Sequence, residues 1–305
     1  MTTLKHPSYL AVDGGGTRCR LALRAPSGLM HVTETGSANV TTDLAAATQE
    51  ILRGLDALAQ ISGLAVEEIA ALPAYLGLAG ITGEETAKRL AAALPFAQIR
   101  IEDDRPAALR GVLGARDGMV AHCGTGSFVA TQVAGQMRFV GGWGAVLGDE
   151  ASAQWVGRQA LARSLDVVDE LTEASALSHH VLTTLGGGAG VVRFAASATP
   201  AAFGRFAPDV TRLADEGCAM SRAILQQAAR HIATTLTTLG WQDGLRICLT
   251  GGIGPSYAPY LPAAMRAALR DPEGQPLDGA MALAEEFAAD CATKDTLRRE
   301  THVRC

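Results

Sequence analysis

Short apolar runs that end at glycine-rich turns dominate the first part of the chain. The run Tyr9-Leu-Ala-Val leads into Asp13 and a stretch of glycines, and a partly alternating stretch, residues 18–24, follows. An apolar run, a glycine turn and an alternating run predict two strands joined by a tight turn. A third strand is expected over residues 30–35.

Helical and strand-like segments then alternate. An Ala- and Leu-rich stretch with Asp43 as its N-cap predicts a helix over residues 42–60. The remaining expected elements are a buried strand over 73–80, a helix over 84–94, a strand over 99–101 and a helix with Pro106 in its first turn. This alternation favours an α/β fold.

The plan of residues 9–24 repeats later in the chain. Residues 119–133 again show an apolar run, a Gly/Thr-rich turn and a second apolar run. After them we expect a helix over 151–163, a mostly helical region over 164–240 interrupted at 186–190 and by a loop at 200–208, a strand over 245–250, and a closing helix over 279–290. The repeat predicts two similar domains facing each other across a cleft, residues 1–114 and 115–305.

Composition excludes several classes of protein. With 305 residues, 48% apolar and 19% charged, the chain is globular and long enough for two domains. Its formal net charge of −5 argues against a nucleic-acid or anionic-membrane surface. No stretch approaches the ~20 apolar residues of a membrane span. The scattered cysteines contain no CxxC pair and the histidines show no zinc-ligand spacing, so we expect a cytoplasmic protein without a disulfide framework or a zinc site.

Two glycine turns are candidate phosphate-binding loops. Asp13 precedes Gly14, Gly15, Gly16 and Thr17, and the second turn holds Gly124, Thr125 and Gly126. Glycines let backbone N–H groups approach an anion closely. A strand rather than a helix follows the glycines, which excludes a dinucleotide fingerprint, and no P-loop motif is present. A single such turn is as well explained by an ordinary hairpin, but its repetition favours two loops that bind one polyphosphate.

Three neighbouring acids, Glu102, Asp103 and Asp104, end the strand before the Pro106 helix. Mutual repulsion raises the pKa of such a carboxyl group, which suits a general base. The alternative is that these acids only cap the helix and stabilise its positive end. The residues alone leave both interpretations open.

A glycine-dense loop over residues 141–152 carries Trp143 and Asp149. Asp149 is suited to hydrogen-bond a hydroxylated ligand, or else it is the N-cap of the next helix with Trp143 in the core. Gly251 and Gly252 follow a strand and either admit the flat face of a nucleotide or form a simple turn. No G-x-S-x-G motif is present, so a serine hydrolase has little support.

Taken together, the motifs resemble one family. They are DGGGTRCRLAL, GSANV, GLAG, EDDRPAAL, CGTGS, GGWGAVLGDEASAQWVG and ICLTGGI, in this order from residue 9 to about 290. They resemble the BadF/BadG/BcrA/BcrD ATPase family and, within it, the N-acetylglucosamine and glucosamine kinases. The resemblance implies an actin/hexokinase-like fold of two ribonuclease-H-like domains around a nucleotide cleft.

The resemblance also implies roles for individual residues. Asp104 matches the catalytic aspartate and Asp13 the residue that holds Mg²⁺ through water. The implied ATP-binding residues are Gly14, Gly15, Gly16, Thr17, Gly124, Thr125, Gly126, Gly251 and Gly252. The implied sugar-binding residues are Asn39, Asp104, Ser127, Gly142, Trp143, Gly144 and Asp149.

The expected function is therefore an ATP- and Mg²⁺-dependent kinase that phosphorylates the 6-hydroxyl of glucosamine or N-acetylglucosamine, and a homodimer is the expected assembly. Two departures from the family pattern are the acid pair Asp103-Asp104 where the family has Asn-Asp, and Ala151 in place of a glycine. A non-catalytic sugar sensor and an ATPase activator subunit are the alternatives. The activator needs cysteines for an iron–sulfur cluster, and no cysteine pair of that kind is present.

Overall fold

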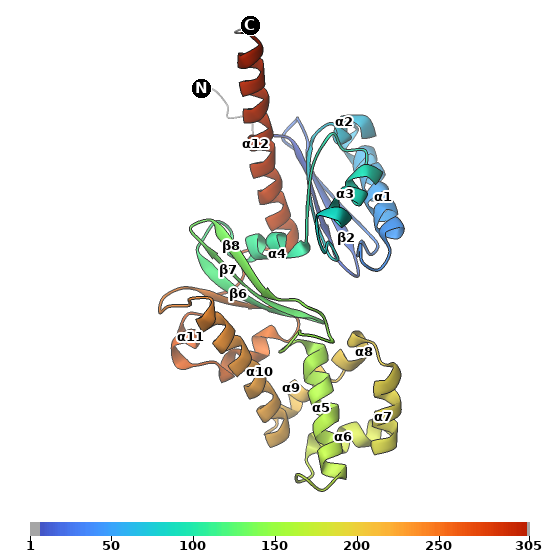
Figure 1. The fold of residues 1–305 in the computed structure, drawn as a ribbon, viewed down its shortest axis with the longest axis vertical. Helices are drawn as coiled ribbons and strands as arrows, with labels where there is room; N and C mark the ends of the chain where they lie inside the picture. Colours follow the sequence, from blue (N-terminus) through green and yellow to red (C-terminus); the bar gives the residue numbers. More distant parts are fainter. Residues whose placement is uncertain (1–6, 304–305) are drawn as a thin grey trace. The chain divides into compact units, whose positions relative to one another are not determined.

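The computed structural model describes the backbone of residues 7–303 and the side chains as far as residue 294 (Figure 1). The chain forms two compact units. Unit 1 comprises the residues up to 115 together with those from 273 onward, and unit 2 comprises residues 116–272. Assigning all residues from 115 to 305 to the second domain was therefore wrong, because the last segment belongs to unit 1.

Unit 1 contains a five-stranded sheet in the order β3-β2-β1-β4-β5. Its strands are β1 (Tyr9–Gly14), β2 (Cys19–Arg24), β3 (Met30–Thr35), β4 (Pro73–Leu78) and β5 (Gln98–Glu102). The first three are antiparallel neighbours, and β4 and β5 run parallel to β1. All five strands expected from the sequence in this part of the chain are confirmed.

Helices cover both faces of this sheet (Figure 1). One face carries α1 (Leu44–Ser62), α2 (Val66–Ala70) and α3 (Glu84–Ala93), and the other carries α4 (Asp104–Leu113) and α12 (Pro276–Val303). Asp43 caps α1 as predicted, since its carboxylate accepts from the Ala46 N–H at 2.9 Å. Apolar residues of β1, β2 and β4, among them Leu10, Leu21 and Leu76, pack with those of α1 in one buried cluster.

Two glycines explain why the closing helix joins unit 1. A Cβ on Gly111 of α4 would overlap the carbonyl of Gln275, and a Cβ on Gly279 of α12 would overlap the carbonyl of Ala107. The two helices thus touch backbone to backbone, and Ala280 and Ala284 of α12 are fully buried. Such contacts join segments far apart in sequence, so no local pattern indicated them.

Unit 2 repeats the plan of unit 1 with a four-stranded sheet in the order β8-β7-β6-β9. Its strands are β6 (Gly118–Cys123), β7 (Ser127–Val133), β8 (Gln136–Gly141) and β9 (Ile247–Thr250). Here too three antiparallel strands are followed by one strand parallel to the first of them. A single bridge from Ile247 to Leu269 stands where β5 stands in unit 1. The internal repeat of the sequence is confirmed as a repeat of topology.

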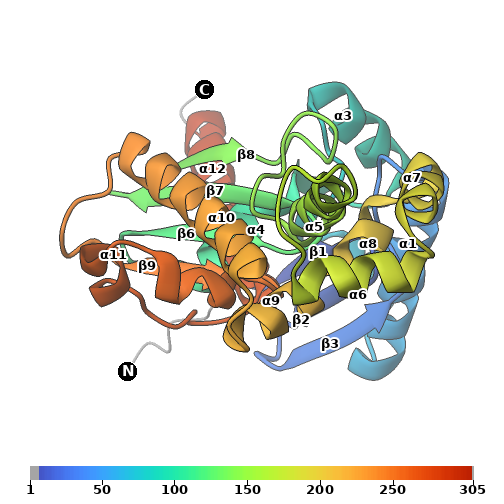
Figure 2. The ribbon, with the colours of Figure 1, turned by 90° about the horizontal axis from the view of Figure 1, so that it is seen from below.

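The remaining elements of unit 2 are helical. They are α5 (Ala153–Val168), α6 (Ala176–Leu185), α7 (Gly188–Ser197), α8 (Pro200–Gly204), α9 (Ala207–Asp215), α10 (Ala219–Thr238), η1 (Gly254–Tyr260) and α11 (Ala263–Ala267). Figure 2 shows α10 lying over the sheet, and it packs on η1, α5 and α9. The loop expected at 200–208 is wrong, because α8 and α9 lie there. Thr199 caps α8, and Pro200 and Pro208 each lie in the first turn of a helix, where the missing N–H of proline costs nothing.

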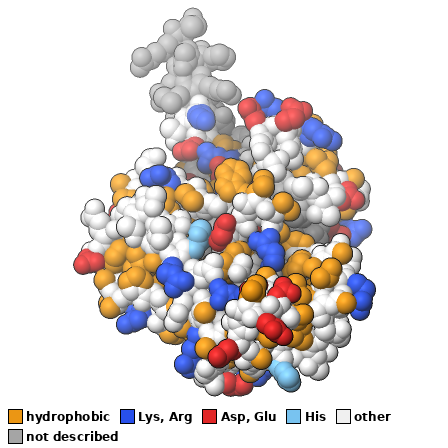
Figure 3. Space-filling view, turned by 60° about the horizontal axis from the view of Figure 1, so that its bottom comes forward, with side chains coloured by type: hydrophobic (Ala, Val, Ile, Leu, Met, Phe, Trp, Pro, Cys, Tyr) orange, Lys and Arg blue, Asp and Glu red, His pale blue; other side chains and the backbone are white. Residues whose placement is uncertain are grey.

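The surface carries mixed charge. Figure 3 shows acidic and basic side chains scattered among hydrophobic and uncharged ones on the face in view. Among the described residues, no helix is both long enough and apolar enough to cross a bilayer.

Candidate active site

The carboxyl ends of three strands of unit 1 lie at one edge of its sheet. The parallel register pairs Gly14 with Leu78 and Gly77 with Glu102, so β1, β4 and β5 end side by side. The first glycine loop follows β1, and Asp103 and Asp104 follow β5. Ligands of open α/β sheets bind outside the carboxyl ends of such strands. The topology therefore brings together the loop and the acids that the sequence singled out.

The first glycine loop contains glycines of two kinds. A Cβ on Gly14 would overlap the Leu78 side chain, so this glycine is required by packing. On Gly15 and Gly16 a Cβ would meet no atom nearer than 3.6 Å and 4.0 Å, respectively. Backbone bonds hold the loop, because the Gly15 N–H donates to Arg18 O at 2.9 Å and Gly15 O accepts from the Ala38 N–H at 3.0 Å. Gly15 and Gly16 are thus open toward solvent, as a loop that receives a ligand requires.

Asn39 lies beside this loop. Its Oδ1 accepts from the N–H groups of Thr41 and Thr42 at 3.0 and 3.2 Å, which fixes the side-chain amide. The Nδ2 atom lies 4.0 Å from the Cβ position of Gly16. Because Oδ1 is used by the backbone, Nδ2 is left as a donor on the side of the glycine loop.

Asp13 forms a partly buried ion pair with Arg20, its cross-strand neighbour on β2. Both bonds fall on one carboxylate oxygen, Oδ2, which accepts from Nη2 at 2.5 Å and from Nε at 3.1 Å. No motif in the sequence indicated a role for Arg20. An alternating strand pattern shows which face a side chain is on, but it does not show which pairs meet.

The neighbouring acids Asp103 and Asp104 divide the two roles that the sequence left open. Asp103 is the N-cap of α4: its carboxylate accepts from the Arg105 N–H at 2.9 Å and pairs with the Arg105 guanidinium at 2.7 Å. Asp104 is the first residue of α4. Burial, with the charges of Asp103 and Asp13 adding to it, raises the pKa of Asp104 to about 6. Asp103 is therefore the helix cap, whereas Asp104 has the raised pKa that suits a base.

In unit 2 the second glycine loop is supported from two sides. Its Gly124 N–H donates to Gly126 O at 2.9 Å, and the Ala153 N–H at the start of α5 donates to Gly124 O at 2.8 Å. Gly251 follows β9 with φ of 80°, and a Cβ there would overlap the carbonyl of Cys123. A Cβ on Gly252 would meet nothing within 4 Å. The structure thus brings the second loop and the Gly251-Gly252 turn together at one sheet edge.

Asp149 lies against the second loop. Its side chain is buried, the residue being 7% exposed, and the N–H groups of Ser127 and Gly144 bond its carboxylate. Burial, the largest effect, nevertheless raises its pKa. A Cβ on Gly126 would lie 3.0 Å from Asp149 Oδ2, so the glycine makes room for the carboxylate.

Two structural alternatives for this segment are wrong. The N-cap of α5 is Ser152, not Asp149. Ala151, with φ of 66°, lies in the left-handed region and cannot be the start of the helix, which begins at Ala153. Trp143 is 77% exposed and therefore not a core residue.

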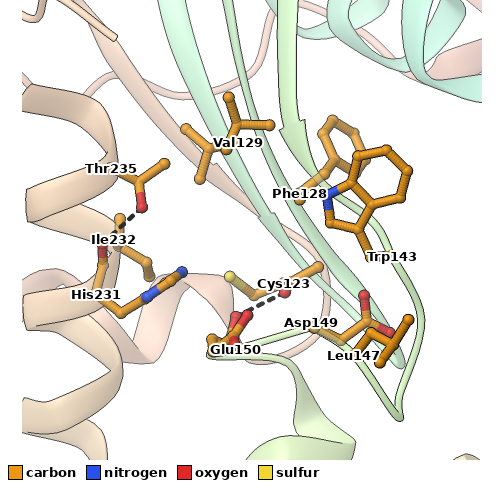
Figure 4. Close-up of a pocket in the computed structure, with 14 residues that line it drawn as sticks. Cys123, Phe128, Val129, Trp143, Leu147, Asp149, Glu150, His231, Ile232 and Thr235 are labelled. Atoms are coloured by element: carbon orange, nitrogen blue, oxygen red, sulfur yellow. Dashed lines mark hydrogen bonds between the residues drawn. The ribbon is translucent and has the colours of Figure 1, made fainter. Parts of the chain in front are cut away.

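A cavity of about 270 Å³ opens beside this segment (Figure 4). Figure 4 shows His231, Ile232 and Thr235 on α10 facing the loop that carries Leu147, Asp149 and Glu150. Ser127 stabilises the loop, since its hydroxyl donates to Glu150 O at 2.6 Å. The α10 residues were missed in the sequence, because nothing in a long amphipathic helix shows which residues line a cavity.

Residues 10–281 match the family model of the BadF/BadG/BcrA/BcrD ATPase family. The chain belongs to this family. The resemblance stated from the sequence motifs is thereby confirmed, and the match covers most of both units.

Two relatives show where in the family the chain lies. It is 26% identical over 279 residues to the glucosamine kinase GspK of Vibrio cholerae, covering 90% of this chain and 95% of that one. A crystal structure of a putative N-acetylglucosamine kinase from Chromobacterium violaceum is 31% identical, with a TM-score of 0.78, over 92% of this chain and 99% of that one.

The predicted actin/hexokinase-like fold is also confirmed. A glucokinase of the ROK family from Streptomyces griseus, solved with glucose and AMPPNP, has a TM-score of 0.52 and 15% identity over 92% of this chain and 99% of that one. At that identity the likeness concerns the fold alone.

Proposed function

We propose that this protein is an ATP-dependent amino-sugar kinase that transfers the γ-phosphoryl group to the 6-hydroxyl of glucosamine or N-acetylglucosamine. Membership of an ATPase family and the similarity to a glucosamine kinase and to a putative N-acetylglucosamine kinase support it. The observation that carries the proposal is Asp104, a half-buried carboxyl group with its pKa raised to about 6, at the same sheet edge as the open first glycine loop.

Asp104 is the proposed general base. With a pKa of about 6 its carboxyl group is mostly ionised at pH 7, yet it is a better proton acceptor than an ordinary aspartate. In phosphoryl transfer the protein mainly positions the reactants and stabilises charge, and the base accepts the hydroxyl proton late in the reaction. Arg105 is held by Asp103, so the neighbouring guanidinium is directed to the cap rather than to Asp104.

The two glycine loops are the proposed phosphate-binding elements. The loops Gly14 to Thr17 and Gly124 to Gly126 would bind the phosphates through those backbone N–H groups that are not bonded within the loop, which excludes the N–H groups of Gly15 and Gly124. Gly251 and Gly252 would lie against the adenosine. Asn39 Nδ2 and the Asp149 carboxylate would hydrogen-bond sugar hydroxyls, with Ser127 and the Gly142-Trp143-Gly144 turn completing the sugar site. Asp149 is suited to this role because its backbone bonds hold a charged acceptor in one orientation.

Asp13 would hold Mg²⁺. The ion prefers carboxylate oxygens and keeps several of its waters, so one or two protein carboxylates suffice. Asp13 fits, because Arg20 occupies only Oδ2 and leaves Oδ1 for a metal-bound water. Within the described residues, no group of three or more acidic, histidine or cysteine side chains forms a closed metal cage. When bound, Mg²⁺ would neutralise charge on the phosphates.

The composition further supports a cytoplasmic protein that binds neither nucleic acid nor membranes, and we propose a homodimer as its assembly. Light scattering on the purified protein measures the mass of the assembly directly. A mass twice that of the 31.6 kDa chain is the expected result.

An ADP-release assay over a panel of sugars tests the proposed function. Glucosamine or N-acetylglucosamine should stimulate ADP formation and yield the 6-phosphate. An activator ATPase would release ADP without sugar, and a sensor would bind sugar without releasing ADP. Either result would contradict the proposal.

The same assay tests the base. Asp104→Asn keeps the size of the side chain but removes the base, and kcat should fall about 10²–10⁴-fold. Asp103→Asn is the matched control: asparagine is an equally good N-cap, and burial, the main cause of the raised Asp104 pKa, remains, so kcat should fall far less than in Asp104→Asn. If kcat instead fell in the Asp103 variant and stayed normal in the Asp104 variant, the base would be Asp103.

A further inference from the structure

His122 occupies in unit 2 the position that Asp13 occupies in unit 1. Each is the last but one residue of the first strand of its sheet, directly before the strand's final residue, Gly14 or Cys123. Each also pairs with an antiparallel neighbour, Asp13 with Arg20 and His122 with Phe128, and with a parallel one, Gly77 and Thr250. The two side chains therefore occupy equivalent positions in the duplicated fold, each at the end of the strand that leads into a glycine loop.

The imidazole of His122 is held on two sides. Its ring stacks on Phe128, with ring centroids 5.2 Å apart and an interplanar angle of 21°. Its Nδ1 lies 3.0 Å from Thr250 Oγ1, within hydrogen-bond distance. A ring with one face and one nitrogen occupied in this way has a fixed orientation, and only Nε2 remains to interact with a ligand.

Nε2 is directed at the second glycine loop. It lies 3.2 Å from the position that a Cβ on Gly124 would occupy, which is closer than most side chains tolerate. The imidazole therefore occupies the space into which a side chain at residue 124 would project. No side chain other than that of glycine fits at residue 124 without moving the ring.

We propose that His122 is a nucleotide-binding residue: its Nε2–H donates a hydrogen bond to a phosphate oxygen bound at the Gly124–Gly126 loop. A threonine hydroxyl can donate or accept, so Thr250 accommodates either tautomer of the ring. A phosphate oxygen only accepts, and the bound nucleotide selects the tautomer with the proton on Nε2 while Thr250 donates to Nδ1. Burial lowers the pKa of His122, in keeping with a neutral imidazole as the donor. The inference rests on the proposed binding of ATP at this loop.

Two substitutions separate the roles of the ring nitrogens. In His122→Gln the side-chain amide reaches the place of Nε2, whereas in His122→Asn it reaches only that of Nδ1. By titration calorimetry, His122→Asn should bind ATP about tenfold or more weakly, since a hydrogen bond to a charged group is lost. His122→Gln should stay within about threefold of the unsubstituted protein. Adenosine, which has no phosphate, should bind all three proteins equally.

A second measurement needs no substitution. In the nitrogen-15 spectrum of the histidine-labelled full chain, the Nε2 signal of His122 should take the position of a protonated nitrogen when ATP is added. The signal is assigned by its absence in His122→Gln.

Several results would overturn the inference. They are unchanged ATP affinity in His122→Asn, equal loss of ATP affinity in both variants, a parallel loss of adenosine affinity, or an unprotonated Nε2 in the ATP complex. Each leaves the proposed function standing, provided the unsubstituted protein binds ATP. If the unsubstituted protein binds no ATP, the proposed function fails and the inference fails with it.

Discussion

The two glycine hairpins share a backbone plan but not a chemistry. In both, the first loop residue donates its N–H across the turn, Gly15 to Arg18 O and Gly124 to Gly126 O, each at 2.9 Å. Before the first loop stands a carboxylate, Asp13, neutralised by Arg20. Before the second stands an imidazole, His122, stacked on Phe128. The two units thus have a side chain at the same position of the duplicated topology, but it is an acidic one in unit 1 and an imidazole in unit 2.

The glycines differ in the same way. Gly15 and Gly16 are open and have no packing reason to be glycine, whereas Gly124, Gly126 and Gly251 are each crowded by their own unit. Glycine is therefore found in these loops for two different reasons. In the first loop it leaves space for the proposed ligand. In the second it also leaves space for neighbouring protein atoms, those of His122, Asp149 and the Cys123 carbonyl. Three predictions test this contrast.

The partners of the two equivalent residues, Arg20 and Phe128, should contribute unequally to the free energy of unfolding. Arg20→Met leaves the Asp13 carboxylate partly buried and unpaired, so the free energy of unfolding should fall by about 3 kcal/mol. Phe128→Leu removes the ring contacts with His122 and Phe139 but leaves no charge unpaired, and should lower the free energy of unfolding by about 1–2 kcal/mol. Urea unfolding of both variants at neutral pH measures the difference. Equal losses would show that the two hairpins are stabilised alike.

Alanine substitutions should separate the glycines of the two loops. Gly251→Ala introduces a Cβ at a φ of 80° and against the Cys123 carbonyl, and should destabilise the fold by about 2–5 kcal/mol. Gly15→Ala should lower the free energy of unfolding by less than about 1 kcal/mol, because a Cβ there meets no atom nearer than 3.6 Å. It should weaken ATP binding at least about tenfold, because the Cβ would stand at the proposed phosphate site.

Thermal unfolding and calorimetric titration with ATP measure these two effects. The control is Gly83→Ala, at another glycine with open surroundings, outside both loops. It should leave the ATP affinity unchanged and lower the free energy of unfolding by no more than about 1 kcal/mol, since Gly83 is the N-cap of α3. A Gly15 variant that binds ATP normally would contradict a ligand at the first loop.

The smallest expected effect concerns the acidic edge of unit 1. The pKa of Asp104 is about 6 in the folded chain against an ordinary value of 3.8, so the folded state holds this proton more tightly than the unfolded state. Stability therefore falls as pH rises through this window, and the penalty is complete above about pH 6. Asp104→Asn removes the charge and should gain about 1–3 kcal/mol over the unsubstituted protein at pH 7.5, but almost nothing at pH 3.5.

Urea unfolding at the two pH values measures this gain. Asp103→Asn, which keeps the cap, should show a smaller pH-dependent gain, because it removes the charge of Asp103 but not the burial that is the main cause of the raised Asp104 pKa. If Asp104→Asn destabilises the protein equally at both pH values, Asp104 is structural rather than a base held ready for reaction.

The sequence by itself determined the strands, the two glycine hairpins and the family. These follow from local physics, because the alternation of apolar residues and the freedom of glycine act over a few neighbouring positions. The repeat of residues 9–24 at 119–133 sufficed to predict a duplicated topology, Asp43 was predicted correctly as a helix cap, and the strand bounds were predicted to within about two residues.

Only the tertiary structure decided which side chains meet. It paired Asp13 with Arg20, assigned the cap to Asp103 and the raised pKa to Asp104, buried Asp149, exposed Trp143 and joined α12 to unit 1. It also placed His122 where unit 1 has Asp13. Each depends on contacts between segments far apart in the chain, and burial and charge at a residue are set by those contacts rather than by its neighbours in sequence.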